Sequence, residues 1–520
     1  MRLYLVLAEC SLMKSSFLRL VPLALLAGTF HPAAAQSVTP TLQEARVHKK
    51  DKGVPKVAPI PQQLFGTLPL STHSEDARKF VELALDKYEN DLLDDSLVLA
   101  RHSTEQDPQF PLGFALVSFI ARRTAPDRPA LQRAQQLLPR ATPQERLLVQ
   151  WMTNVQQSNL LPAISSMNDL LQAFPNDKHV LYLTGEWLFA QQESERARKM
   201  LESVTRLDPD FAPAYNVLGY AYISTGDPDP ARALSALQRY AELQPGSPNP
   251  EDSLGEVSRF AGDDRASLEH YRAALQIDPL FFSSQLGLGD TLTLMGDYSD
   301  AREEYDRAMY ASDAPRDTFH ARFQKALVHF WEGQPAEGRK ALADLEQQAT
   351  VKKEPYPQFE IGFGAALLAP DSQAELAKLS TLQTWLGDPI PGFDDADRNI
   401  SLATVWREQA RIYSRLGQPA AALRAISRLE ALATDSRDLV VENCYESAHG
   451  YQLFAAGDYA DAVDELSADP RSPLVLSQLA LAQQKSGNGS AVQTLTRLKF
   501  QRAPTPEWYL ATHVAAQDAH

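Results

Sequence analysis

Residues 215–245 read YNVLGYAYISTGDPDPARALSALQRYAELQP. Tyr215, Leu218 and Tyr222 recur at the spacing of three to four residues that places large apolar side chains on one face of an α-helix. A Gly-Asp turn then interrupts the pattern and a second apolar-periodic segment follows. Pro245 ends that segment, because proline cannot continue a helix. The stretch therefore predicts a helix, a tight turn and a second helix.

This helix–turn–helix unit repeats along the chain. Self-similarity at a fixed period of 20 to 50 residues is typical of repeat architectures. The terminal prolines Pro175, Pro209, Pro245 and Pro279 are separated by 34, 36 and 34 residues, and Asp313 takes the same place 34 residues later. The Gly-Asp turns keep step with them at Gly226-Asp227, Gly262-Asp263 and Gly296-Asp297. The period predicts a chain of stacked helix pairs.

The unit resembles the tetratricopeptide repeat (TPR), whose 34-residue signature is Trp-x2-Leu-Gly-x2-Tyr, then Ala-x3-Phe, then Pro. Four consecutive units carry the resemblance, and they contain Leu181-x2-Thr184-Gly185, Tyr215-x2-Leu218-Gly219, Glu251-x2-Leu254-Gly255 and Gln285-x2-Leu288-Gly289. The stretch NPEDSLGE at 249–256 is similar to part of the long TPR regions of bacteria. The resemblance implies an all-α TPR solenoid, a right-handed superhelix of about eleven or twelve helix-turn-helix pairs.

Small residues predict where the helices touch. The glycine at the eighth repeat position lets the two helices of a unit approach closely, and small residues of the second helix admit the next unit. Gly255 and Ala308 are therefore expected at helix contacts. One helix pair cannot bury both of its apolar faces, so its stability must come from stacking against neighbouring pairs. The 520 residues thus predict one long solenoid rather than three or four separate domains.

The clarity of the repeat divides the chain into regions. Residues 74–346 are predicted to form an N-terminal TPR array, and residues 401–510 a C-terminal TPR array. Residues 347–400 lie between them, carry five prolines and are predicted to form an irregular helical insert. Cys444 lies in a helical part of the C-terminal array and is interpreted as a buried, unreactive thiol.

The N-terminal residues have the pattern of a secretory signal peptide. Lys14 and Arg19 supply a positive region, residues 20–30 an apolar run, and Ala33-Ala34-Ala35 a cleavage site. An apolar run of this length is too short to span a hydrocarbon core of ~30 Å. We therefore expect an exported protein, periplasmic or secreted, with no integral membrane span after cleavage.

The signal peptide is assigned to residues 1–35, with Met13 as a second candidate start. Glu9 favours Met13, because an acidic residue does not suit the basic region of a signal peptide. Residues 36–73 contain five prolines and little helical pattern. They are predicted to form a proline-rich linker.

The composition excludes several classes of partner and site. Fifty Lys and Arg against 66 Asp and Glu give a net charge of −16. Removal of residues 1–35 leaves 47 bases against 65 acids, or −18. Such a charge disfavours nucleic acid and anionic lipid as partners. The two cysteines, Cys10 and Cys444, can build neither a disulfide framework nor a cysteine-rich zinc site.

The sequence contains no recognised motif for catalysis or cofactor binding. His-Glu-x-x-His, Gly-x4-Gly-Lys-Ser/Thr and Gly-x-Ser-x-Gly do not occur. Asp395, Asp397 and Asn399 have the spacing that begins a calcium loop. However, Ile400 replaces the required glycine and Trp406 the required glutamate, so this stretch is interpreted as an N-capping acidic loop. We therefore expect no enzyme activity, cofactor or metal.

The concave groove is the remaining candidate site. The TPR resemblance implies that the first helix of each pair lines this groove, through roughly the second, fifth, ninth and twelfth repeat positions. The candidate residues at such positions are Tyr182, Glu186, Asn216, Tyr220, Asp252, Glu256, Arg259 and Asp290. They are expected to form one continuous strip with four acids and one base. Asn249 is also a good N-cap and Asp252 suits the positive start of a helix, so a purely capping role for Asp252 stays open.

Together these features predict an exported, non-catalytic TPR scaffold that binds protein or peptide partners in its groove. An acidic strip with aromatic residues favours a basic or polar extended peptide. Two alternatives stay open: an envelope hydrolase or transferase with an unrecognised groove site, and an outer-membrane-associated assembly subunit. Groove variants that lose a partner without altering turnover would separate the scaffold from the enzyme.

Overall fold

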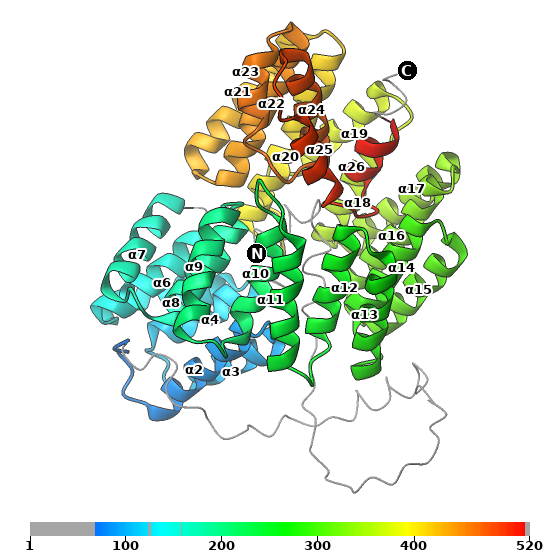
Figure 1. The fold of residues 1–520 in the computed structure, drawn as a ribbon. Helices are drawn as coiled ribbons and strands as arrows, with labels where there is room; N and C mark the ends of the chain where they lie inside the picture. Colours follow the sequence, from blue (N-terminus) through cyan, green and yellow to red (C-terminus); the bar gives the residue numbers. More distant parts are fainter. Residues whose placement is uncertain (1–67, 123–125, 158, 515–520) are drawn as a thin grey trace, which may run out of the picture.

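The chain is a stack of antiparallel helix pairs in a computed structural model that describes residues 68–122, 126–157 and 159–514 (Figure 1). Within those residues, α2 to α25 form twelve pairs and no β-strand occurs. The predicted all-α solenoid of eleven or twelve pairs is therefore confirmed. The predicted signal peptide and residues 36–67 of the predicted linker lie outside the described residues.

The helix bounds follow the repeat along the chain. The pairs are α2 Glu75–Glu89 with α3 Leu93–Gln106, α4 Pro111–Ala121 with α5 Arg128–Leu137, α6 Pro143–Gln156 with α7 Leu160–Ala173, α8 Lys178–Ala190 with α9 Ser194–Leu207, α10 Ala212–Ile223 with α11 Pro230–Leu243, α12 Asn249–Ala261 with α13 Asp264–Ile277, α14 Phe282–Met295 with α15 Tyr298–Ala311, α16 Pro315–Trp331 with α17 Pro335–Lys352, α18 Pro355–Leu367 with α19 Ser372–Trp385, α20 Asp395–Arg415 with α21 Pro419–Ser436, α22 Leu439–Ala456 with α23 Tyr459–Leu466, and α24 Pro473–Ser486 with α25 Ala491–Lys499. A short 3₁₀ turn, Leu138–Arg140, follows α5, and the helix α26 Pro506–Tyr509 leads into a π-helical turn, Leu510–Val514.

Two of the three predicted Gly-Asp turns end the first helix of a pair and start the second; at Gly226-Asp227, by contrast, α10 already ends at Ile223 and Asp229 caps α11. Gly262 has a left-handed φ of 84° at the end of α12, a conformation that glycine adopts without strain. Asp263 then caps α13, because its carboxylate accepts a hydrogen bond from the Ala266 N–H at 3.0 Å. Gly296 repeats the left-handed ending after α14, with a φ of 90°. At these two positions the predicted tight turn between the two helices of a pair is confirmed.

The predicted register is confirmed by the glycines at helix contacts. A Cβ placed on Gly255 would lie 2.9 Å from the ring of Tyr271 in the paired helix α13. A Cβ on Gly289 would lie 2.5 Å from the ring of Tyr305 in α15. Ala308 is fully buried, as expected for a residue at a helix contact.

The first and second helices of the pairs form two layers with different burial. In α13 the buried residues are Ser267, Leu268, Tyr271 and Ala274, which occupy one face of the helix. By contrast, every residue of α14 from Phe282 to Thr293 is buried. The first helices therefore form an inner layer, which is most completely covered at α14, whereas the second helices form an outer layer with one solvent-exposed face.

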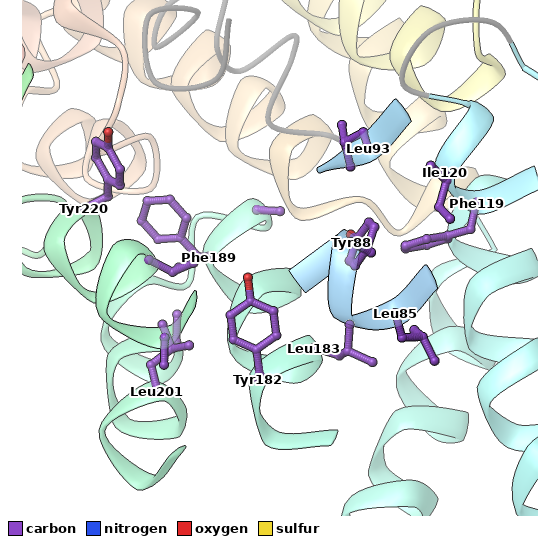
Figure 2. Close-up of a cluster of buried hydrophobic side chains, with 14 of the residues drawn as sticks. Leu85, Tyr88, Leu93, Phe119, Ile120, Tyr182, Leu183, Phe189, Leu201 and Tyr220 are labelled. Atoms are coloured by element: carbon purple, nitrogen blue, oxygen red, sulfur yellow. The ribbon is translucent and has the colours of Figure 1, made fainter. Parts of the chain in front are cut away.

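An aromatic row joins the first helices of the four N-terminal pairs. The ring centroids of Tyr88 and Phe119 are 5.6 Å apart, those of Phe119 and Trp151 5.3 Å, and those of Trp151 and Trp187 5.9 Å. Figure 2 shows Tyr88 of α2 and Phe119 of α4 in one buried cluster with Tyr182 of α8. Contacts between successive inner helices thus hold this end of the solenoid together.

The predicted irregular insert at 347–400 is corrected by the structure. Helix α17 continues to Lys352, α18 and α19 form an ordinary pair, and α20 already begins at Asp395. Pro355 occupies the first turn of α18, where a proline costs no helical hydrogen bond. Residues 353–354, 368–371 and 386–394 connect these helices, so the stack of helix pairs continues through the region.

The described end of the predicted linker, residues 68–73, is packed rather than extended into solvent. Leu68 and Leu70 are buried in the N-terminal core. The backbone N–H of Ser71 donates a hydrogen bond to Glu145 at 2.8 Å, and the Thr72 hydroxyl donates one to Asp107 at 2.6 Å. This segment therefore belongs to the first repeats.

The C-terminal pairs fold back against the N-terminal array. In Figure 1, the helices α20 to α25 stand above the ends of α8 to α11. The Arg471 guanidinium donates a hydrogen bond to the Phe189 carbonyl at 2.7 Å, and the Asn443 amide donates one to the Gln192 side chain at 2.8 Å. One contact is made at the C-terminal end of α8 and the other at the turn that follows it. Segments about 250 to 280 residues apart in sequence therefore meet on one edge of the solenoid.

Candidate functional site

The eight residues predicted to line the groove all lie in the inner layer, and all are buried. Their side chains belong to α8, α10, α12 and α14, and none of the eight residues is more than 7% exposed: Tyr182, Glu186, Asn216, Tyr220, Asp252, Glu256, Arg259 and Asp290. The inner-layer placement agrees with the repeat positions used for the prediction. The burial differs from it, because a groove-lining residue was expected to be accessible.

Polar side chains connect α10 to α12 within the inner layer. The Ser253 hydroxyl donates a hydrogen bond to the Asn216 side-chain oxygen at 3.1 Å. One turn further along the same two helices, the Tyr220 hydroxyl donates to the Glu256 carboxylate at 3.0 Å. Each predicted site residue of α10 is therefore bonded to the next inner helix.

Arg259 forms the centre of the polar contacts between α12 and α14. Its guanidinium lies 3.3 Å from a Glu256 carboxylate oxygen and 3.5 Å from an Asp290 carboxylate oxygen. The Tyr305 hydroxyl donates a second hydrogen bond to Asp290 at 2.8 Å. Nearby, the Ser284 hydroxyl donates to Asp252 at 2.6 Å. We call the bonded residues of α10, α12 and α14 the polar ladder, which comprises Asn216, Tyr220, Asp252, Ser253, Glu256, Arg259, Ser284 and Asp290.

Tyr182 and Glu186 are not included in the polar ladder, because both side chains form hydrogen bonds with α2. The Tyr182 hydroxyl donates a hydrogen bond to the Glu89 carbonyl at 3.2 Å. Glu186 accepts one from the Tyr88 hydroxyl at 3.2 Å. The first helix of the array therefore reaches across to the fourth pair and contacts the predicted site residues there.

Burial controls the protonation of the polar ladder. It raises the pKa of Glu256 to about 8, because the nearby Arg259 cation offsets only part of the cost of desolvation. Burial also raises the pKa of Asp290 against the lowering influence of Arg259. For Arg259 itself, burial lowers the pKa, but Tyr271, Asp290 and Glu256 more than offset this and keep it above its ordinary value. Near neutral pH the ladder therefore does not carry the full negative charge that its composition suggests.

The expected accessible strip is thus replaced by a buried hydrogen-bonded network. The acidic residues of the ladder pair with a buried cation and accept hydrogen bonds from hydroxyl groups. Their carboxyl groups therefore interact with other residues of the fold and do not face solvent. The Asp252 carboxylate links α12 to α14 through Ser284. Asn249 is not the N-cap of α12: it is the first helical residue, and its amide donates to the Tyr240 hydroxyl at 2.8 Å.

The acidic stretch before α20 agrees only in part with its prediction. The N-cap is Asp394, whose carboxylate accepts a hydrogen bond from the Ala396 N–H at 2.9 Å, whereas Asp395 and Asp397 lie in the first turn. The Tyr356 hydroxyl donates to Asp397 at 2.8 Å, and burial raises the pKa of Asp397 to about 7. In the described part of the chain, no three His, Cys, Asp or Glu side chains converge as a metal site would need. Cys444 is buried, as predicted.

A second candidate surface involves the C-terminal residues, which the sequence prediction missed. We call residues 501–514 the strap. It begins as a non-helical segment and continues through α26 into the π-helical turn. Ala503 is buried in the core of the N-terminal array, whereas Trp508 and Tyr509 are half-buried. The strap therefore follows the last repeat and packs against earlier ones.

Four elements of the fold bind the strap. Arg502 forms an ion pair with Asp264, the first residue of α13. The Glu507 carboxylate lies 3.1 Å from the guanidinium of Arg407 in α20. Trp508 stacks on Trp331 at the end of α16, with ring centroids 5.6 Å apart and an interplanar angle of 27°.

Further strap contacts are apolar. Pro506 approaches Gly364 of α18, where an added Cβ would lie 3.4 Å from the proline ring. Tyr509 meets the Trp331 ring edge-on at 5.2 Å. We call the surface formed by Asp264, Trp331, Gly364 and Arg407 the strap groove. A proline-rich, aromatic ending after the last repeat (APTPEWY, 503–509) was the sequence signal that could have indicated it.

None of the described helices has the length and apolar character that crossing a membrane requires.

The repeats are similar to a known family. The tetratricopeptide repeat family model matches residues 182–248 and 254–317, which cover most of α8 to α15. No curated protein is significantly similar in sequence to the chain.

Solved structures of repeat proteins are also similar to parts of the chain. The MamA protein in one crystal structure is 23% identical in sequence to this chain. The match covers 31% of this chain and 93% of the MamA chain, with a TM-score of 0.28. A tetratricopeptide repeat protein from Parabacteroides merdae is 14% identical, covers 55% of this chain and 99% of its own, and has a TM-score of 0.33. YrrB, described as a TPR protein with an unusual peptide-binding site, is 13% identical over 37% of this chain and 95% of its own, with a TM-score of 0.26.

Proposed function

The chain is a tetratricopeptide repeat protein, and we propose that it acts as a non-catalytic scaffold that binds protein or peptide partners. The observation that supports this function is the stack itself, in which consecutive family repeats between 182 and 317 continue into further helix pairs on both sides. Solenoids of this kind present long surfaces on which extended partners bind. The proposed role therefore rests on the geometry of the stacked helix pairs.

A buried acid in the polar ladder could suggest a general acid, because catalytic carboxyl groups often have raised pKa values. The surroundings of Glu256 favour a structural role. One of its oxygens accepts a hydrogen bond from Tyr220, and the other lies beside Arg259. Burial accounts for its raised pKa. We therefore include Glu256 in the scaffold and not in an active site.

We further propose that the scaffold works in the bacterial cell envelope, either in the periplasm or after secretion. The support is the sequence of residues 13–35, with its basic start, apolar run and Ala33-Ala34-Ala35 site. N-terminal sequencing of chain recovered from the envelope fraction should begin at Gln36. Recovery of folded cytoplasmic protein that still carries Met1 or Met13 would contradict the proposal.

The partner is proposed to be an extended protein segment. A basic segment was expected from the acidic composition of the predicted strip, but the buried acids of the polar ladder cannot be reached without opening the fold. The charge of the ladder therefore does not favour a basic partner. We propose a polar, extended segment as the partner.

Site-specific photo-crosslinking tests the scaffold function without reference to any one groove. A crosslinker is placed singly at solvent-exposed outer positions such as Arg265 and Lys340, and at the half-buried Trp508. At least one position should give a discrete protein adduct in the envelope fraction, whereas a crosslinker at the buried Tyr305 should give none. The absence of any discrete adduct at every exposed position would contradict a scaffold role.

A further inference from the structure

A polar cleft lies where the N-terminal array meets the start of α20. The cleft has a volume of about 420 Å³, and its walls come from the start of α5, the end of α6, the start of α7 and residues 393–395. Arg128 of α5 forms an ion pair at 3.3 Å with Asp395, which lies 267 residues later in the chain. The volume is within the range of ~300–1,000 Å³ that is usual for small-molecule sites. We call this space the junction cleft.

Carboxamide side chains dominate the lining of the junction cleft. A carboxamide group offers both hydrogen-bond donors and an acceptor. The Gln135 amide donates a hydrogen bond to the Gln157 side-chain oxygen at 2.7 Å, which leaves the Gln135 oxygen and the Gln157 amino group open. Asn159 precedes α7 without capping it through its side chain. The five carboxamide residues that line the cleft are Gln132, Gln135, Gln156, Gln157 and Asn159.

Gln156 brings an unpaired acceptor to the cleft from a buried position. The residue is only 7% exposed, and its amide nitrogen donates to the Ser118 hydroxyl at 3.2 Å and to the Met152 carbonyl at 3.0 Å. Because a carbonyl oxygen can only accept, the second bond fixes which end of the amide is the nitrogen. The Gln156 oxygen accepts no hydrogen bond from the described residues, whereas polar atoms of buried side chains ordinarily have a partner. A ligand in the cleft can supply the missing donor.

The charged groups of the cleft disfavour an anionic ligand. Three carboxylates line it against one guanidinium, so its formal charge is negative. The carboxylates also have partners within the fold: Asp127 and Asp394 cap the helices that follow them, and Asp395 pairs with Arg128. The groups left open are therefore mainly neutral carboxamides, and the complementary ligand is neutral.

We propose that the junction cleft binds a neutral ligand with several hydroxyl groups, of the size of a mono- or disaccharide. Each hydroxyl group donates and accepts, as the facing carboxamides do. Such a ligand contacts α5 and α6 on one side and residues 393–395 on the other, so its binding strengthens the contact between these distant segments. This inference adds a small-molecule site to the chain and does not depend on the proposed scaffold function.

A sugar fits the cleft better than a segment of a partner protein. Extended peptides are recognised by contacts that repeat along a strand edge or a groove. The polar groups of the junction cleft instead surround one compact space and come from four different parts of the fold. A compact ligand with hydroxyl groups on all sides matches that arrangement.

Isothermal titration calorimetry of the full chain tests the proposal with glucose, N-acetylglucosamine and cellobiose as probes. At least one of these neutral sugars should bind with a dissociation constant of about 1 mM or lower. Glucuronic acid carries a carboxylate and should bind roughly tenfold or more weakly than glucose. N-acetylglycine N-methylamide, which has peptide groups and no hydroxyl group, should also bind roughly tenfold or more weakly than the best sugar.

Three outcomes of the titrations would contradict the proposal. The absence of saturable binding for all three neutral sugars would overturn it. Equal affinity for glucuronic acid would overturn the neutral character of the ligand, and equal affinity for the peptide-like amide would show that the cleft recognises a peptide segment instead.

Exposed carboxamides allow the site to be altered without touching the core. Gln132→Ala and Asn159→Ala remove side chains at exposed positions, and the double variant should bind the sugar roughly tenfold or more weakly while its helicity is unchanged. Gln136→Ala is the matched control, because Gln136 is also exposed on α5 but does not line the cleft. Equal sugar affinity of the double variant and the control would overturn the proposal.

Hydrogen exchange followed by mass spectrometry gives a second readout on the wild-type chain. A saturating concentration of the best sugar should slow exchange in residues 386–395 and at the start of α5, while α13 and α15 are unaffected. Unchanged exchange on both sides of the cleft would overturn the proposal. Failure of these measurements with intact photo-crosslinking at the outer positions would remove the junction cleft as a site and leave the scaffold function standing.

Discussion

The polar ladder and the strap groove belong to the same inner layer, but they are filled in different ways. In the ladder, Tyr220 bonds Glu256 and Arg259 bonds Asp290, so each contact joins residues 36 or 31 positions apart in adjacent repeats. In the strap groove, the contacts join residues 100 and 238 positions apart. Contacts between adjacent repeats can be lost only by separating those repeats, whereas strap contacts can be lost while every repeat stays in place.

This difference between the polar ladder and the strap groove separates residues that hold the repeats together from residues that hold a terminal segment. The ladder residues occupy the repeat positions from which a groove is usually predicted, yet they stabilise the stack. The strap groove was not indicated by the repeat positions, yet it holds the C-terminal residues by ion pairs and by aromatic stacking. Substitutions in the ladder should therefore affect global stability, and substitutions in the strap should affect local opening.

Removal of the central cation should have the largest effect. Arg259→Leu leaves the Asp290 and Glu256 carboxyl groups buried without their cation, and the cost of breaking such a buried pair is about 3–5 kcal/mol of unfolding free energy. The comparison is Arg265→Leu on α13, where an exposed ion pair with Glu269 contributes about 0–1 kcal/mol. Urea unfolding followed by circular dichroism gives both values, and equal midpoints for the two variants would contradict the structural role of the ladder.

The ladder should also make stability depend on pH. The folded-state pKa of Glu256 is about 8, above its ordinary value of 4.5, so the folded chain binds more protons than the unfolded chain between these values. Stability contributed by this group is therefore present at low pH and lost as the pH rises from about 5 to about 8, at up to about 1.4 kcal/mol per pH unit. Glu256→Gln should flatten the slope, whereas Glu269→Gln on the surface should keep it. A slope that is the same in both variants would exclude Glu256 as its source.

The addition of a single methyl group at a helix contact should destabilise the paired helices. Gly289→Ala places a Cβ about 2.5 Å from the Tyr305 ring, which is itself fixed by its hydrogen bond to Asp290. Such overpacking costs about 1–3 kcal/mol. Gly246→Ala is the matched control, because no atom lies within 4 Å of its added Cβ. A thermal melt should separate the two variants, and coincident melting would contradict the register.

The strap should contribute least to global stability. Trp508→Ala removes the stack on Trp331, and an aromatic pair of this kind contributes about 0.5–1.5 kcal/mol. The urea midpoint should therefore change less than in Arg259→Leu, while limited proteolysis after residue 500 becomes faster. A midpoint change as large as that of Arg259→Leu would place the strap among the stabilising elements of the stack.

Much of the fold could be predicted because its signals are local. The spacing of prolines and Gly-Asp turns gave the helix pairs, and the small residues Gly255 and Ala308 gave the register. The region 347–400 was misinterpreted because its prolines were treated as interruptions. Pro355 instead starts α18, and a proline in the first turn of a helix leaves the helix intact.

The candidate site was less predictable, because accessibility depends on contacts between distant parts of the chain. Repeat positions placed Tyr220, Asp252 and Asp290 correctly in the inner layer. Their burial depends on the packing of the whole superhelix, which no local pattern encodes. The strap was missed for the same reason, since its partner Asp264 lies 238 residues before Arg502.

Native-state hydrogen exchange of the wild-type chain tests the contrast between the two regions most directly. The amides of α12 and α14, which carry the polar ladder, should exchange only when the repeats separate. The amides of residues 501–514 should exchange roughly tenfold or more faster, through local opening at low denaturant. Equal protection of the strap and α14 would contradict the account, because it would show that the strap leaves its groove only when the stack unfolds.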